Sequence, residues 1–259
     1  MNKISENTPH TLTFGDNDDI EIIWLHGWGQ SHSCFLPLAN LFENKATNLL
    51  VDLYGFGKTP LLFKGAGTVD YAHALKNTIL SKPKPKKRII IGHSFGCRVA
   101  VHLANENPEL ADGYVLISAA GLKPKRSLKW KIYASYLKLL GKLAGLSDNI
   151  FKTSLKKQFS TRFGSSDYKN AGELRETFVR VVNEDLGPEA ANIKQPVLLI
   201  YGQDDAETPV DLGQRYAKLI PQASLKVLDG YAHLDILSRG AHQCQTMINK
   251  FLESLESKT

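Results

Sequence analysis

Short apolar segments alternate with helical patterns along this 259-residue chain, and this alternation restricts the fold more than any other feature. The apolar segments have roughly four to eight residues, are rich in valine, isoleucine and leucine, and lack strict polar alternation, which is typical of strands buried on both faces of a mainly parallel sheet. They are Ile20–Leu25, Ala46–Leu53, Arg88–Gly92, Gly113–Ser118, Pro196–Gly202 and Ser224–Asp229. The helical patterns are Ser33–Phe42, Thr68–Leu80, Ser94–Asn105, Pro209–Leu219 and Ala241–Leu255. This order predicts an α/β fold with a mostly parallel, doubly wound sheet, to which Thr11–Phe14 adds an antiparallel edge strand.

The alternation stops after Leu122 and resumes at Gln195. We therefore predict a core formed by residues 1–122 and 195–259, with a helical insertion formed by residues 123–194 between two strands of the sheet. The helical patterns inside the insertion are Arg126–Gly145, Asn149–Phe159 and Ala171–Asn183. The insertion holds 15 lysines and arginines against 7 aspartates and glutamates, a balance of +8, although the whole chain carries only +6. All of the basic excess therefore lies in the insertion, and this change in composition supports the predicted boundary.

Composition and residue spacing exclude several classes of protein. No apolar stretch approaches the roughly 18–20 residues needed to span a bilayer, and the start of the chain lacks the apolar run of a signal peptide. Cys34, Cys97 and Cys244 lie far apart and match no metal-ligand spacing. The segment around Gly57 is similar to the end of a phosphate loop, but Asp52 occupies the position of the required first glycine. We expect a cytoplasmic protein with no transmembrane segment, disulfide framework, metal, cofactor or nucleic-acid partner.

A candidate nucleophile lies between a predicted strand and a predicted helix, in the sequence Gly92-His93-Ser94-Phe95-Gly96. In a nucleophile elbow the chain turns sharply from strand to helix and lifts a serine hydroxyl above the sheet. Glycines on both sides let the backbone approach where a Cβ atom would clash. The motif by itself is also compatible with an ordinary strand–turn–helix that contains an incidental serine. The position of the motif between strand and helix favours Ser94 as the nucleophile, and Gly92, His93 and Gly96 are the neighbouring residues expected to support the turn.

A second motif, His26-Gly27-Trp28-Gly29, follows the first long apolar segment. A serine nucleophile requires two preorganised N–H donors for the oxyanion, one just after the serine and one in a loop after an earlier strand. The backbone N–H groups of Phe95 and Trp28 occupy these positions, and the helix that begins at Phe95 adds a favourable potential for negative charge. A plain glycine turn beside a buried tryptophan is the alternative interpretation.

An acid and a base complete the candidate site. The loop after the fifth apolar segment contains Asp204 and Asp205, either of which could orient a histidine, and Thr208 in the same loop has the features of a helix cap. His233 lies in the loop after the last predicted strand. Ser94, an aspartate and His233 then follow one another in the chain order of the α/β-hydrolase triad, each at the carboxyl end of a predicted strand.

The sequence resembles the α/β-hydrolase superfamily over essentially its whole length. The resemblance is carried by the His26–Gly29 loop, by Val51–Thr59 (family form D-x-P-G-x-G-x-S), and by the elbow, acid and histidine loops. Within the family's acid-loop pattern the matching position is Asp205, so the resemblance implies Ser94, Asp205 and His233 as catalytic residues, with Asp204 as second choice. It also implies that residues 123–194 are a cap that covers the pocket.

Two residues depart from the family pattern. Tyr54 replaces the usual proline of the Val51–Thr59 segment, and Cys97 stands where a second glycine commonly follows the elbow. Neither change removes a catalytic group. Because Cys97 lies inside the predicted helix, it is a poor rival to Ser94 as the nucleophile.

The resemblance implies a carboxylesterase that acts through an acyl-enzyme on Ser94. Serine at the elbow argues against the dehalogenase and epoxide hydrolase branches, which use aspartate there. The His26–Gly29 loop is similar to that of the pimeloyl-carrier-protein methyl ester esterases, which dock an acidic acyl carrier protein on a basic cap. The +8 insertion suits such a partner, but a solvated cap surface or contact of the Arg126–Gly145 helix with an anionic membrane would explain the same charge. A carbon–carbon bond hydrolase, a perhydrolase and a weakly catalytic ligand receptor remain as alternatives.

Overall fold

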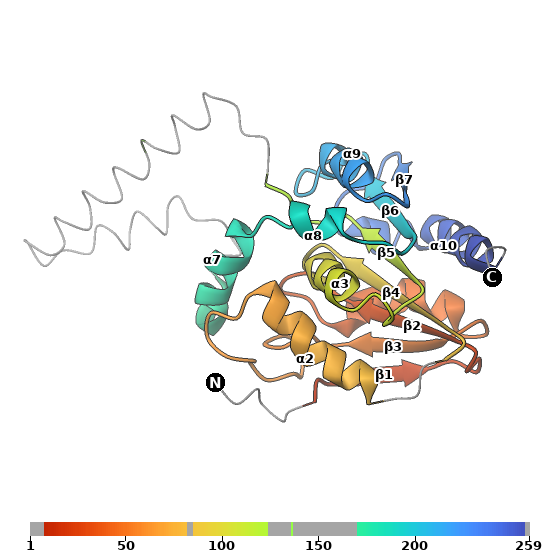
Figure 1. Ribbon diagram of the computed structural model, residues 1–259, viewed down its shortest axis with the longest axis horizontal. Coiled ribbons are helices and arrows are strands. Elements are labelled where there is room, and N and C mark those ends of the chain that lie inside the picture. The colour runs from red at the N-terminus through yellow and green to blue at the C-terminus, as the bar shows by residue number, and fades with distance from the viewer. Residues whose placement is uncertain (1–7, 82–84, 124–135, 137–169, 257–259) are drawn as a thin grey trace, which may run out of the picture.

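The computed structural model describes residues 8–81, 85–123, 136 and 170–256, which form two layers of helices around one twisted sheet (Figure 1). Seven strands make up the sheet in this part of the chain, in the order β1-β3-β2-β4-β5-β6-β7. Their bounds are β1 Thr11–Phe14, β2 Ile20–Leu25, β3 Thr47–Val51, β4 Lys87–His93, β5 Gly113–Ile117, β6 Val197–Gly202 and β7 Ala223–Leu228. β1 pairs with β3 in antiparallel orientation and the other neighbouring strands are parallel. The predicted α/β fold and its antiparallel edge strand are confirmed.

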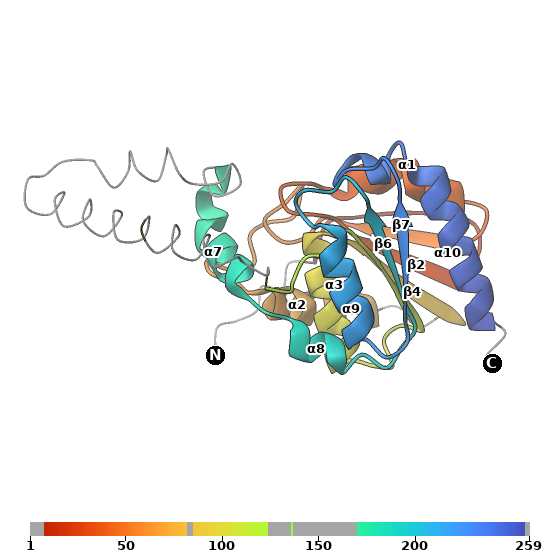
Figure 2. The same cartoon turned by 90° about the horizontal axis from the view of Figure 1, so that it is seen from above.

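Helices cover both faces of the sheet (Figure 2). One face packs against α2 Thr68–Leu80, α3 Phe95–Glu106, α8 Gly187–Ala191 and α9 Val210–Leu219, and the other against α1 Leu36–Ala39 and α10 Ala241–Glu256. The central strands are buried on both sides, so successive side chains of one strand enter different layers of the core. In β2, Ile23 and Leu25 face the α3 layer whereas Ile22 and Trp24 face the α10 layer, and all four are fully buried.

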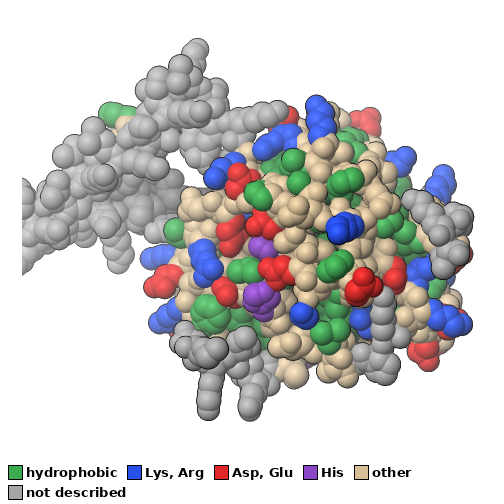
Figure 3. Space-filling view, in the orientation of Figure 1, with side chains coloured by type: hydrophobic (Ala, Val, Ile, Leu, Met, Phe, Trp, Pro, Cys, Tyr) green, Lys and Arg blue, Asp and Glu red, His purple; other side chains and the backbone are tan. Residues whose placement is uncertain are grey.

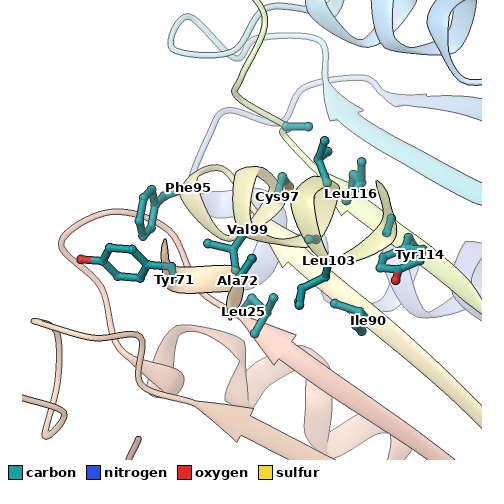
Figure 4. Packing of buried hydrophobic residues seen from close by; sticks show 14 of the residues in the cluster. Leu25, Tyr71, Ala72, Ile90, Phe95, Cys97, Val99, Leu103, Tyr114 and Leu116 are labelled. Atoms are coloured by element: carbon teal, nitrogen blue, oxygen red, sulfur yellow. The ribbon is translucent and has the colours of Figure 1, made fainter. Parts of the chain in front are cut away.

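The α3 layer shows how the core is assembled (Figure 4). Leu25 and Ile90 project from neighbouring strands toward Val99 and Leu103 of α3, and Ala72 of α2 closes the cluster. Each of these branched side chains contributes about 1.5–3 kcal/mol when it leaves water completely. The apolar segments therefore hold the strand ends, and the loops that follow them, in fixed positions.

One predicted helix is broken into three pieces. The structure has a 3-10 turn at His32–Phe35, the short helix α1 at Leu36–Ala39 and a second 3-10 turn at Asn40–Phe42, so a single helix over Ser33–Phe42 was wrong. Pro37 accounts for the break before α1, because it lacks a backbone N–H and its ring would collide with the carbonyl four residues earlier in a continuous helix.

The predicted insertion is described only in part. Its third helical pattern is found as a 3-10 turn at Gly172–Leu174 followed by α7 at Arg175–Asn183, and α8 was not predicted. The patterns at Arg126–Gly145 and Asn149–Phe159 lie outside the described residues, except for Tyr136. The division into core and cap therefore stays a prediction. None of the described helices is long and apolar enough to cross a membrane.

Candidate active site

Ser94 lies at the sharp turn between β4 and α3, with a φ of 49° and a ψ of −104°. A non-glycine residue rarely adopts a positive φ, and such strain is typical of functional sites. The glycines around it permit the turn: a Cβ on Gly92 would lie 2.7 Å from the backbone nitrogen of Cys97, and one on Gly96 would overlap the carbonyl oxygen of Leu25. The strand–turn–helix that the motif predicts is present.

Cys97 lies in the first turn of α3, three residues after Ser94. Its side chain is fully buried, and its thiol lies 3.4 Å from the carbonyl oxygen of Ile117. Burial raises the pKa of the Cys97 thiol far above its usual value, so the thiolate is suppressed. The expectation that Cys97 is a poor nucleophile agrees with this environment.

Asp205 and His233 meet across the ends of β6 and β7. Oδ2 of Asp205 lies 2.8 Å from Nδ1 of His233, and Oδ1 accepts the backbone N–H groups of Glu207 and Thr208 at 2.9 and 2.8 Å. Burial raises the pKa of Asp205, but the hydrogen bonds from His233 and Thr208 outweigh it and lower the pKa to about 2. Asp204 is exposed, so the aspartate that contacts the histidine is Asp205.

Thr208 has a position that sequence reasoning missed. It does not cap α9, because Pro209 is the N-cap residue and the position before a proline is driven away from helical geometry. The Thr208 hydroxyl instead lies 2.8 Å from Asp205 Oδ2, 3.1 Å from the carbonyl oxygen of Ser118 and 3.2 Å from His233 Nδ1. A threonine three residues after the acid was the available signal, and it was interpreted as a cap.

His93 packs against the ring of His233 and contacts its backbone carbonyl. Nε2 of His93 donates a hydrogen bond to the carbonyl oxygen of His233 at 2.9 Å, and the two ring centroids lie 4.7 Å apart. Burial and the neighbouring His233 lower the pKa of His93 to about 3, so His93 is neutral near pH 7. Its proton is then on Nε2, since a carbonyl oxygen can only accept.

The loop after β2 is held by His26. Nε2 of His26 accepts the backbone N–H of Leu53 at 2.9 Å, and Nδ1 donates to the carbonyl oxygen of Gly27 at 2.7 Å. Burial lowers the pKa of His26 to about 4, which keeps the ring neutral and able to accept. The N–H of Gly27 is held by Gln30 Oε1 at 2.9 Å, and the loop turns at Gly29, where φ is 71°.

The side chains of Trp28 and Phe95, the two residues predicted to supply the oxyanion N–H groups, pack against each other. Their ring centroids are 5.4 Å apart at an interplanar angle of 90°, and Trp28 also packs against Phe178 of α7 at 5.1 Å. Phe95 is the first residue of α3, so its backbone N–H has no acceptor within the helix.

Several of the predicted residues line one cavity of about 810 Å³, although Asp205 and Phe95 are not part of its lining. Its lining includes residues from the elbow, from the loops after β2, β6 and β7, and from the turn before α7: Gly27, Trp28, Gly29, His93, Ser94, Leu174, Glu207 and His233. Among the described residues no hydrogen bond joins Ser94 to His233; instead, Nε2 of His233 lies 3.5 Å from Glu207 Oε2. The described group that could hold a metal ion, His10, His32 and Asp52, lies outside this lining.

Comparison with known proteins agrees with this fold. The profile of the Alpha/beta hydrolase family matches residues 22–243, so the chain belongs to this family. It is 26% identical over 249 residues to Protein ABHD8 of Bos taurus, covering 92% of this chain and 56% of that protein, so it spans little more than half of that relative. It is 25% identical over 268 residues to the pimeloyl-[acyl-carrier protein] methyl ester esterase of Chromobacterium violaceum, covering 95% and 97% of the two chains. The solved lipase-esterase related protein of Clostridium acetobutylicum superposes with a TM-score of 0.69 at 20% identity, over 94% of this chain and 99% of that one.

Proposed function

We propose that the protein is a carboxylesterase that forms an acyl-enzyme on Ser94. The observation that carries the proposal is the shared cavity: Ser94, at a strained elbow, lines the same cavity as His233, whose Nδ1 lies 2.8 Å from the buried carboxylate of Asp205. A hydroxyl, an imidazole and a carboxylate in this order are the components of acyl transfer. Family membership and esterase-type relatives support the same class of reaction.

In the proposed mechanism, Asp205 fixes the tautomer of His233. With a pKa of about 2, Asp205 is ionised near pH 7 and holds the proton of His233 on Nδ1. Nε2 is then free to take the proton of the Ser94 hydroxyl while Oγ attacks the acyl carbon of the ester. Catalytic hydrogen bonds are often long before substrate binds and tighten in the complex, so Nε2 turns from Glu207 to Ser94 at that stage.

The backbone N–H groups of Trp28 and Phe95 stabilise the oxyanion of the tetrahedral intermediate, aided by the positive end of the α3 dipole. Protonated His233 then gives its proton to the leaving alkoxide, and the alcohol departs. Water attacks the acyl-enzyme with His233 again as the base, which releases the carboxylic acid and restores Ser94.

Ser94→Ala tests the assignment directly. We expect kcat for a p-nitrophenyl ester to fall by about 10³-fold or more, because the remaining groups cannot supply a nucleophile. The matched control is Ser33→Ala, which removes the hydroxyl of a serine outside the cavity lining. A fluorophosphonate probe should label the parent protein and the control but not Ser94→Ala. Retention of most activity by folded Ser94→Ala, or failure of the probe to label the parent, would contradict the proposal, and the second result would favour a ligand receptor.

We further infer that the substrate is an acyl ester delivered by an acidic carrier protein. Support comes from the similarity to the Chromobacterium violaceum esterase, which extends over nearly the whole length of both chains, and from the net charge of +8 of residues 123–194. Elsewhere the charges are mixed: on the face drawn in Figure 3, basic and acidic side chains are interspersed. Opposite potentials steer encounter and are screened by salt.

The carrier proposal is tested by comparing a carrier-bound ester with the same ester free in solution. We expect kcat/KM for the carrier-bound ester to be higher at low salt and to fall as NaCl is added, while the free ester changes little. Equal rates that do not depend on salt would refute the carrier. A salt-dependent gain with anionic vesicles in place of the carrier protein would assign the basic residues to a membrane instead.

A further inference from the structure

Two histidines and an aspartate meet outside the proposed catalytic cavity. His10 precedes β1, His32 begins the 3-10 turn after β2, and Asp52 follows the last residue of β3. Nδ1 of His32 lies 2.8 Å from Asp52 Oδ1, and Nδ1 of His10 lies 3.1 Å from Asp52 Oδ2. The candidate ligand atoms of the three residues all lie within 4.8 Å of one another. Sequence spacing could not reveal this group, because its members belong to three separate segments that only the fold brings together.

The carboxylate of this group is rigidly held. The Asp52 side chain is fully buried, Oδ1 accepts the backbone N–H of His32 at 2.7 Å, and Oδ2 accepts the backbone N–H of Lys58 at 2.9 Å. A carboxylate whose oxygens are oriented by neighbouring donors is typical of a metal ligand.

The two histidines contact Asp52 differently, because Nδ1 of His32 is hydrogen-bonded to Asp52 Oδ1 at 2.8 Å. Nδ1 of His10 is buried and makes no hydrogen bond, although it lies only 3.1 Å from Asp52 Oδ2, because the alignment is unsuitable. Two ligands that each lie about 2.1 Å from one Zn²⁺ are separated by about 3.0–3.4 Å, and their lone pairs point at the ion and not at each other. The separation of His10 Nδ1 from Asp52 Oδ2 fits this distance, whereas that of His32 Nδ1 from Asp52 Oδ1 is shorter and is that of a hydrogen bond. The imidazole rings of His10 and His32 lie 5.3 Å apart and are tilted by 43°.

We propose that His10, His32 and Asp52 bind a divalent transition-metal ion, for which Zn²⁺ is the probe. Two imidazoles with one carboxylate suit Zn²⁺, Co²⁺ and Ni²⁺, whereas Mg²⁺ and Ca²⁺ prefer sites made of oxygen ligands. The side chains of His10 and His32 are 33% and 18% exposed, although Nδ1 of His10 itself is buried.

The ion would tie the start of the chain to the loops that form the proposed catalytic cavity. The backbone N–H of Asp52 donates to the carbonyl oxygen of His10 at 2.9 Å, and the next residue, Leu53, donates to His26 in the loop after β2. His32 lies two residues after Gln30, which lines the cavity. The metal therefore stabilises the His26–Gly29 loop, which carries the proposed oxyanion donor Trp28, and takes no part in the chemical step.

Calorimetric titration of the tag-free, EDTA-treated full chain with ZnCl₂ tests the site, with MgCl₂ as the control salt. We expect one Zn²⁺ per chain and a Tm raised by several degrees, because a ligand that binds only the folded state stabilises it. His10→Ala and His32→Ala should each weaken Zn²⁺ binding by about tenfold or more, since each removes one of three protein ligands. The matched control is His73→Ala, which removes a half-exposed histidine paired with Glu106 and should leave binding unchanged.

Zn²⁺ that binds equally well to His10→Ala and the parent would overturn the proposal and place the ion on another histidine, with His233 as the first to test. The absence of Zn²⁺ binding to the parent would also overturn it. His10→Ala decides the matter if His32→Ala fails to fold, because His10 is the more exposed of the two ligands. Neither readout depends on esterase activity, so the metal site and the proposed reaction can fail separately.

Discussion

Asp205→Asn would show how the acid loop selects the tautomer of His233. Oδ1 of Asp205 accepts two backbone N–H groups, from Glu207 and Thr208, and Oδ2 faces His233 Nδ1 at 2.8 Å. In the variant, those two donors hold the amide oxygen at the place of Oδ1, since an NH₂ group there would face two other donors. The NH₂ group must then take the place of Oδ2 and donate to His233 Nδ1.

A ring nitrogen that accepts a hydrogen bond cannot carry the proton, so the proton of neutral His233 moves to Nε2. Nε2 then has no lone pair for the proton of Ser94. We expect kcat to fall by about 10⁴-fold, which corresponds to about 5.4 kcal/mol of lost transition-state stabilisation. The backbone geometry of the loop should be unchanged, because both N–H groups keep their acceptor.

The assay is steady-state hydrolysis of a p-nitrophenyl ester by the parent, Asp205→Asn and Asp204→Asn. Asp204→Asn is the matched control, since it makes the same change of charge at the exposed neighbouring residue. Circular dichroism and thermal unfolding establish that each variant is folded. The tautomer argument is refuted if Asp205→Asn keeps more than a tenth of the parent kcat, or if Asp204→Asn loses as much.

Two further predictions concern stability. His26 and His93 have pKa values of about 4 and about 3 in the folded protein against 6.5 in the unfolded chain, so the unfolded state binds more protons below pH 6.5. The free energy of unfolding, measured with urea, should therefore fall as the pH is lowered from 6.5 toward 4, by up to about 1.4 kcal/mol per pH unit for each histidine. A free energy of unfolding that does not change with pH over this range would contradict the burial of the two histidines as neutral rings. Gly96→Ala pushes a methyl group into the backbone of β2, so it should cost about 1–3 kcal/mol and lower Tm; an unchanged Tm would mean that α3 is not packed as tightly as described.

Sequence patterns predicted the sheet well because burial on both faces imposes a simple rule on each central strand. Both faces of the Ile20–Leu25 strand are covered by the core, so apolar residues occupy every position except Glu21 and the strand is visible in the sequence. The segment from Ser33 to Phe42 was harder, since its apolar spacing is helical while Pro37 forbids one continuous helix. Apolar spacing reports which side faces the core, but not whether the backbone hydrogen bonds can form.

The candidate site was predictable where a residue is specified by local backbone geometry. Ser94 is marked by the glycines that its turn needs, but Asp204 and Asp205 both follow the same strand, and only the resemblance to the family distinguished them. Thr208 was misassigned because a threonine before Pro209 has the same signature whether it caps a helix or faces a carboxylate. The His10, His32 and Asp52 cluster was invisible for another reason, since its members meet only through the pairing of β1 with β3 and of β3 with β2.

The strand order explains why β5, which supplies no proposed catalytic side chain, governs the geometry of the site. β2 and β4 are neighbours and carry the Trp28 loop and the elbow, while β6 and β7 are neighbours and carry Asp205 and His233; β5 separates the two pairs. The carbonyl oxygen of Ile117, the last residue of β5, accepts the backbone N–H of Ser94 at 3.1 Å. The next carbonyl oxygen, that of Ser118, lies 3.1 Å from the Thr208 hydroxyl, and Ser118 has a φ of 49°. Two consecutive carbonyl groups at the end of β5 therefore hold the nucleophile on one side and the acid loop on the other, and the second of them belongs to a residue with a strained backbone. A shift of this strand end would change the distance between Ser94 and His233 without altering either residue.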